Sequence, residues 1–188
     1  MSAAAAGTAG GRTALRCARA SGAALALAVL ALCAACGYGV VGLGGKLPGG
    51  FTRVEVPIFE NRTTRTDISR QLTEDFINRL VSSGKISMTK GVEAQAVIRG
   101  VVTAYRLEPI TFDSNKKPLA NRLIVVMDVS LVANEGGRVL FAEKGVSARH
   151  DYALQDDLQE NDRLEDEAVD RVSELMSQKL VGLMLEGF

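Results

Sequence analysis

The sequence contains no tryptophan, and aromatic residues make up only 5% of its 188 positions. Platforms that stack nucleobases depend on such side chains, and so do sugar-binding grooves. Their scarcity argues against both classes of binding protein. With 47% hydrophobic and 23% charged residues, the composition instead fits one globular domain with a core of its own.

Histidine is almost absent too, since His150 is the only one in the chain. A zinc site takes three or four ligands from Cys, His and carboxylates at characteristic spacings, and His150 has no such partners. No serine lies in the G-x-S-x-G turn of a Ser/His/Asp hydrolase. Although Arg149 and Asp151 flank His150, we expect no metal site and no catalytic activity.

A basic surface is also missing. The first 35 residues hold Arg12, Arg16 and Arg19 and no acidic residue, so the remainder carries 19 basic and 22 acidic residues, a charge near −3. Nucleic-acid binding depends on cationic surfaces that displace counterions. We therefore expect no nucleic-acid partner.

The region before Cys36 has the organisation of a signal peptide. Three arginines precede an uncharged apolar run at residues 20–35, which ends in small residues. A membrane-spanning helix is the alternative, but the run is shorter than the roughly 20 residues that crossing requires, and glycines follow it. Residues 1–35 are therefore predicted to be a removable signal peptide.

Cys36 is the predicted lipid-attachment site. The sequence Cys33-Ala34-Ala35-Cys36 resembles a lipobox, in which the last cysteine is acylated and becomes the new N-terminus. Reading Cys33 as the acylated residue would place the bulky Leu32 beside the cut. Cleavage leaves Cys36 as the one remaining cysteine, so no disulfide can form within the chain. A buried spare cysteine is the alternative; lipidation explains the lone thiol, and this covalent lipid is the only cofactor we expect.

Residues 36–50 are interpreted as the lipidated cysteine and a glycine-rich tether. The letters of a dinucleotide-binding loop, G-x-G-x-x-G, occur at 37–42. That motif functions only between a strand and a helix, whereas here a cleavage site precedes it and further glycines follow. By resemblance to other lipoproteins, Gly37 after the cysteine implies sorting to the outer membrane.

Residues 51–188 are predicted to form a single α+β domain, with two helices on one face of a mainly antiparallel or mixed sheet of four to five strands. Alternation predicts a strand near 52–57, with Val54, Val56 and Ile58 on one face. A polar turn at 60–66 precedes a helix whose apolar face holds Ile68, Leu72, Phe76 and Leu80 and which ends at Gly84.

The second half of the domain is predicted to be a meander of strands and a closing helix. Strands are expected at 86–89, 94–107, 122–134 and 138–147, with a long hairpin loop at 108–121 that contains two prolines. The closing helix, 162–185, has one apolar face comprising Leu164, Ala168, Val172, Leu175, Met176 and Leu183.

Two charged clusters are candidate sites. The acidic run at 155–167 could bind metal or perform carboxylate chemistry, but it lacks the spacing of a calcium loop, and acids favour a helix start. Lys116 and Lys117, with Arg122 after them, form a basic cluster on the predicted loop. Loops often carry binding function; a soluble loop tip is the equally supported alternative.

Several segments in order resemble the LptE family of lipopolysaccharide-assembly lipoproteins. They are the lipobox, the Cys-Gly-Tyr start at Cys36, the passage RVEVPIFENRT, the helix LTEDFINRL and the closing strand SARHDY. The resemblance implies two helices on a four-stranded sheet, and it covers nearly all of the chain after Cys36.

The resemblance also implies a function that is not catalytic. Members sit as a plug inside the outer-membrane barrel LptD, assist its assembly and bind lipopolysaccharide. Lys116 and Lys117 occupy the loop implicated in that binding, whereas the family's second basic position falls here in the acidic run near Asp157. The expected location is the outer membrane, lipid-anchored, facing the periplasm or lying inside the barrel. The alternative is a periplasm-facing lipoprotein that binds another envelope protein, such as a cell-wall synthase.

Overall fold

The structure is a computed structural model that describes residues 47–84 and 86–186. The predicted signal peptide at 1–35, the lipid site Cys36 and most of the tether at 36–50 lie outside these ranges. Within them, no helix is long and apolar enough to cross a membrane.

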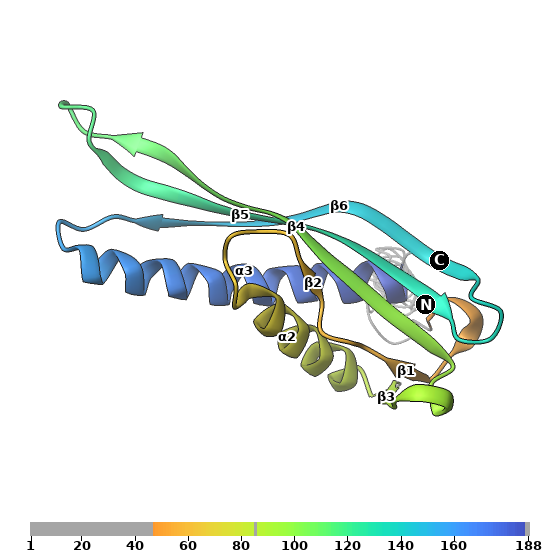
Figure 1. The fold of residues 1–188 in the computed structure, drawn as a ribbon. Coiled ribbons are helices and arrows are strands. Elements are labelled where there is room, and N and C mark those ends of the chain that lie inside the picture. The colour runs from red at the N-terminus through yellow and green to blue at the C-terminus, as the bar shows by residue number, and fades with distance from the viewer. Residues whose placement is uncertain (1–46, 85, 187–188) are drawn as a thin grey trace, which may run out of the picture. The chain divides into compact units, whose positions relative to one another are not determined.

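A mixed six-stranded sheet forms the framework (Figure 1). Three long strands make an antiparallel meander: β4 (Ala96–Phe112), β5 (Pro118–Ala133) and β6 (Val139–Ala153). Three short strands run parallel: β1 (Arg53–Glu55) between β3 (Ser87–Met88) and β4, and β2 (Glu60–Asn61) beside β4. The predicted α+β class is confirmed, with one strand more than expected. The short 3₁₀ turns η1 (Pro48–Gly50) and η2 (Gly91–Glu93) complete the elements.

Both helices, α2 (Ile68–Ser82) and α3 (Leu158–Glu186), pack on one face of the sheet (Figure 1). Successive side chains of a strand point to opposite faces of the sheet. In β5 every second residue from Leu123 to Leu131 is buried, so one face of this strand packs against the helices. The predicted face of α2 is confirmed, since Ile68, Leu72, Phe76 and Leu80 are all buried. The core therefore lies between the sheet and the two helices.

Gly100 on β4 permits a close approach between the sheet and the segment before α2. A Cβ atom at this position would lie 2.6 Å from the ring of Phe59. The Phe59 ring in turn lies against Phe76 of α2, with ring centroids 5.6 Å apart and planes tilted by 52°. The absent side chain thus makes room for an aromatic pair that joins α2 to the strand layer.

Some apolar positions differ from the sequence prediction. Ile58 is 70% exposed, because β1 ends at Glu55 and the alternation does not continue through Pro57. Leu175 is 45% exposed, since the buried stripe of α3 runs instead through Val172, Met176 and Leu180. Leu164 and Leu183 are only partly buried.

The largest error concerns the predicted hairpin loop at 108–121, most of which is strand. β4 continues to Phe112 and β5 begins at Pro118, so the turn is confined to 113–117. β6 likewise continues to Ala153, α3 begins at Leu158, and the predicted polar turn at 60–66 contains β2. The meander strands are therefore much longer than the core that the helices cover.

Candidate functional site

The extended β4–β5 hairpin projects beyond the end of β6 and the start of α3 (Figure 1). Its strands remain paired from Ala96↔Ala133 to Phe112↔Pro118, with irregularities near Val102, Pro109 and Thr111. Because the strands remain paired so close to the tip, backbone hydrogen bonds fix the positions of the side chains along the hairpin.

The five-residue turn at the tip is closed by Asp113. Its backbone N–H donates to the carbonyl of Lys117 at 2.9 Å, and its carboxylate accepts the N–H groups of Asn115 and Lys117, each at 2.8 Å. Lys116 has a φ of 65°, a left-handed conformation uncommon for a residue with a Cβ. This network holds Lys116 and Lys117 at the exposed tip.

Two of the three predicted basic residues are already paired with acids. The Lys117 ammonium donates to Asp156 in the β6–α3 connection. Arg122 donates to both oxygens of Asp151 on β6, at 2.7 and 2.8 Å. These hydrogen bonds raise the pKa of Lys117 and Arg122 and lower the pKa of Asp156 and Asp151. No ion pair of Lys116 forms within the described part of the chain.

The structure groups Lys116 with Lys117 but separates Arg122 from them. Four residues of strand lie between Lys117 and Arg122, which places the two about 17 Å apart along the strand. The acidic partners of these cations were not predicted from the sequence. Asp151 is the register partner of Arg122 on the neighbouring strand, and the acidic run containing Asp156 was interpreted only as a helix start.

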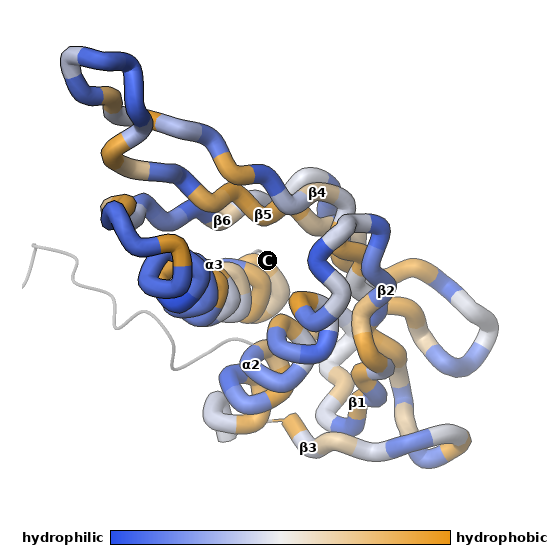
Figure 2. The backbone as a smooth tube through the Cα atoms, turned by 60° about the vertical axis from the view of Figure 1, so that its left-hand side comes forward, coloured by the Kyte–Doolittle hydropathy of each residue, from blue (hydrophilic) through white to orange (hydrophobic). Residues whose placement is uncertain are grey.

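Exposed apolar side chains accompany the charges along the hairpin. They are Leu107, Ile110, Phe112 and Leu119, and Phe112 is 53% exposed. Figure 2 shows the hydrophilic turn followed by apolar positions on both strands. Scattered exposed apolar residues are ordinary, but four on one hairpin beside a lysine pair form an amphipathic surface. We call residues 107–119 the hairpin tip region.

The acidic run and His150 have structural surroundings of their own. The Asp157 carboxylate accepts the N–H of Gln159 at 2.9 Å in the first turn of α3, which agrees with the helix-start interpretation. His150 and Tyr152 line a cleft of about 590 Å³ between β6 and α3, together with Leu164, Glu167 and Arg171. Within 47–84 and 86–186, no three His, Cys, Asp or Glu side chains are grouped so that they could hold a metal ion.

The strands and helices thus define a small α+β domain with an exposed β-hairpin. Residues 51–182 match the model of the family described as LptE: Lipopolysaccharide-assembly. The chain therefore belongs to the LptE family of lipopolysaccharide-assembly proteins, a family of envelope lipoproteins. This confirms the resemblance drawn from the sequence.

Solved structures with a similar outline include several lipoproteins. One from Caulobacter crescentus CB15 is 13% identical, with a TM-score of 0.49 over 68% of this chain and 84% of that one. Rare lipoprotein B from Shewanella oneidensis is 12% identical, with a TM-score of 0.46 over 70% of this chain and 95% of that one. A comparison with curated proteins gave no match.

Proposed function

We propose that this protein is an outer-membrane lipoprotein that binds lipopolysaccharide and acts as plug and assembly partner of an LptD-like barrel. Membership of the lipopolysaccharide-assembly family is the observation that carries the proposal. Lipid on Cys36 would hold the domain at the membrane. The function is binding and structural, without a chemical step.

The hairpin tip region supports lipopolysaccharide as the ligand. Lys116 supplies a cation that has no acidic partner among the described residues, and Lys117 supplies a second that can exchange Asp156 for a phosphate oxygen. Ammonium groups bind phosphate as point charges. Phe112 and Leu119 offer apolar surface to acyl chains beside these charges. One hairpin thus presents groups suited to both parts of the ligand.

The sheet face opposite the helices supports a large protein partner. The outward-facing positions of β4 and β5 include the half-buried apolar residues Val97, Val101, Ile124, Val126 and Val132. Neither α2 nor α3 covers this face (Figure 1). A partly apolar sheet face that these helices leave free suits a protein partner, such as the wall of a barrel, that would shield it from water.

The double substitution Lys116→Glu with Lys117→Glu tests the ligand. We expect weaker binding of purified lipopolysaccharide to the full-length protein in detergent, with a flatter dependence of the dissociation constant on salt, because charge-assisted contacts at exposed sites are screened by ions. The matched control is Lys90→Glu with Lys144→Glu, which makes the same charge change at exposed positions outside the hairpin. Equal affinity and salt dependence in both double variants would exclude the hairpin as the contact.

Depletion in cells separates this proposal from the alternative, a lipoprotein that binds another envelope protein such as a cell-wall synthase. Loss of surface lipopolysaccharide, together with copurification of a large barrel protein on the tagged chain, supports the proposal. Altered cell-wall synthesis with normal surface lipopolysaccharide supports the alternative. Recovery of the chain only as a free monomer from native outer membranes would refute the barrel partnership.

A further inference from the structure

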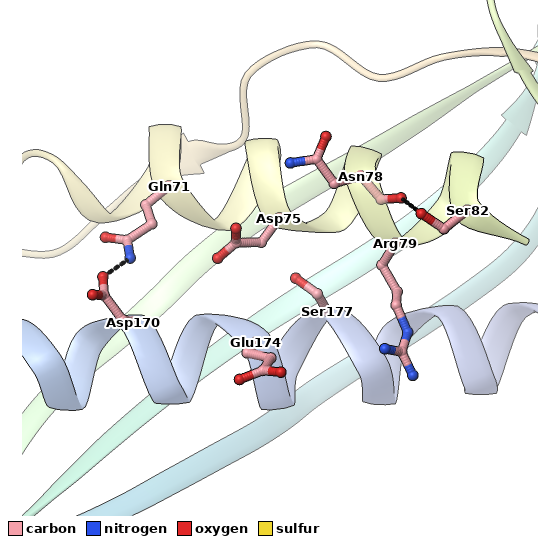
Figure 3. A pocket seen from close by; sticks show the side chains of 8 residues that line it. All are labelled: Gln71, Asp75, Asn78, Arg79, Ser82, Asp170, Glu174 and Ser177. Carbon is pink, nitrogen blue, oxygen red and sulfur yellow. Dashed lines mark hydrogen bonds between the residues drawn. The ribbon is translucent and has the colours of Figure 1, made fainter.

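A polar groove runs between α2 and α3, away from the hairpin. Its volume is about 480 Å³, and it is lined by Gln71, Asp75, Asn78, Arg79, Ser82, Asp170, Glu174 and Ser177 (Figure 3). Most helix pairs bury apolar side chains between them. Here the buried Ser173 of α3 donates to Asp75 of α2, and the buried Ser177 lines the groove, so the groove has polar groups at its base.

Two carboxylates of the groove lack a cationic partner. Asp75 of α2 accepts a hydrogen bond from Ser173, and Asp170 of α3 accepts one from Gln71. Neither forms an ion pair with any of the described residues. The third acid, Glu174, is paired with Arg171 at 3.2 Å. The groove therefore holds two carboxylates, one from each helix, that form no ion pair with the described residues, and Arg79 is the cationic side chain that lines it.

Ser177 supplies an independent sign of a ligand. Its side chain lines the groove but is only 2% exposed, and its hydroxyl oxygen has no hydrogen-bond partner among the described residues. Figure 3 shows this hydroxyl directed from α3 toward α2, near Asp75. A buried hydroxyl without a partner is unfavourable. A donor bound between Asp75 and Ser177 would satisfy both groups.

The spacing of the acids indicates the kind of donor. Asp170 is bonded to Gln71, which lies one helical turn before Asp75 on α2, and Asp75 is bonded to Ser173, which lies nearly one turn after Asp170 on α3. The two carboxylates are therefore about one helical turn, roughly 5 Å, apart along the groove. A metal ion does not fit, since these carboxylates belong to no group of described side chains that could hold one. We propose that the groove binds a short aliphatic diamine of about four carbons, one ammonium group between Asp75 and Ser177 and the other at Asp170.

Arg79 limits the length of the ligand. Its guanidinium lines the groove beyond Ser177 (Figure 3), where its positive charge repels any further ammonium group. Ammonium groups donate three hydrogen bonds each, which matches a carboxylate and a hydroxyl at one end and a carboxylate and the Gln71 carboxamide oxygen at the other. A monoamine would satisfy only one end.

Titration of 1,4-diaminobutane into the full-length protein in detergent, followed by calorimetry, tests the proposal. We expect saturable binding that weakens about threefold in Asp75→Asn and in Asp170→Asn, the scale of one exposed ion pair. Ser177→Ala should also weaken binding but leave its salt dependence unchanged. Butylamine should bind more weakly than the diamine.

Glu74→Gln is the matched control, since it removes an acid of α2 that is exposed, pairs with Arg70 and does not line the groove. It should bind the diamine as the unmodified protein does. Thermal melts of each variant verify folding, and Asp75→Asn is close enough in shape to preserve the helix pair. Absence of saturable binding at millimolar diamine overturns the proposal. Equal affinity for butylamine, or equal loss in Glu74→Gln, overturns it as well.

Discussion

At the scale of single residues, Phe76 is the clearest test of the core. It is fully buried, and its ring packs against Phe59. Truncating a buried phenylalanine typically costs about 3 to 5 kcal/mol, a large part of a domain's usual stability of about 5 to 15 kcal/mol. We expect Phe76→Ala to lower the free energy of unfolding by this amount in chemical denaturation.

Val81 on the same helix provides the comparison, since it is 43% exposed. Val81→Ala should change the free energy of unfolding by less than about 1 kcal/mol. If the two variants unfolded at the same denaturant concentration, the assignment of the buried face of α2 would be wrong.

Tyr105 predicts how stability depends on alkaline pH. Its hydroxyl donates to Glu165 at 2.6 Å, and burial, together with this carboxylate, raises the pKa of the phenol. Unfolded tyrosine loses its proton near pH 10, whereas folded Tyr105 retains it. Its contribution to stability is therefore complete below about pH 10 and is lost as pH rises further.

Substitution isolates this contribution. Tyr105→Phe cannot ionise at this position, so its unfolding midpoint should fall less steeply above about pH 10 than that of the unmodified protein. Burial also raises the pKa of Tyr152, so some pH dependence remains in Tyr105→Phe. Identical pH profiles would mean that Tyr105 titrates alike in the folded and unfolded chains.

At the scale of elements, the Lys117–Asp156 pair links the hairpin tip to the connection before α3. The lysine lowers the pKa of Asp156, so the pair is complete above the ordinary aspartate pKa of about 3.9 and is lost as pH falls through the lower, folded value. Lys117→Ala should return the Asp156 pKa toward the ordinary value. NMR titration of the Asp156 carboxyl chemical shift measures this pKa in the unmodified protein and in Lys117→Ala. The same titration midpoint in both proteins would show that the pair does not persist in solution.

The hairpin also shows what sequence patterns could and could not predict. Apolar periodicity was sufficient for the buried parts of β5 and α2, where one face contacts the core. It failed for 108–121, because prolines and polar residues there resemble a loop. Pro118 is the first residue of β5, and Pro109 lies beyond the β2 pairing, where β4 is an edge strand. Proline is tolerated at both kinds of position.

The candidate site was predictable only in part. The run Lys116-Lys117 identified an exposed cationic tip, because local turn residues determine that position. The partner of Arg122 could not be predicted, because Asp151 lies 29 positions away and meets it only through the register between β5 and β6. The α2–α3 groove was missed for a similar reason: Asp75 and Asp170 come together only when the helices pack.

At the scale of the whole molecule, Arg65 joins segments that are distant in sequence. It donates to Asp67 at 2.8 Å, and to Glu165 and Asp166 of α3 at 3.2 and 2.6 Å. Because Glu165 also accepts from Tyr105 of β4, one network connects the entry to α2, the closing helix and the sheet. The domain is therefore held together by the apolar core and by this polar network, and its described residues contain no disulfide.

The membrane attachment should be separable from this fold. The described core residues between the sheet and the two helices all lie beyond residue 46, whereas the predicted anchor, Cys36, precedes them in the sequence. We expect Cys36→Ser to yield a chain without the acyl modification, visible as a lower intact mass.

Several acyl chains, at about 0.8 kcal/mol for each buried methylene, give stable anchoring, so membrane fractionation should detect the loss of anchoring in Cys36→Ser. The thermal midpoint of the domain should stay the same, because the substitution leaves every described core residue unchanged. Detection of the same acylated species in Cys36→Ser, or an unmodified N-terminus in the natural protein, would show that the chain is not lipidated at this residue.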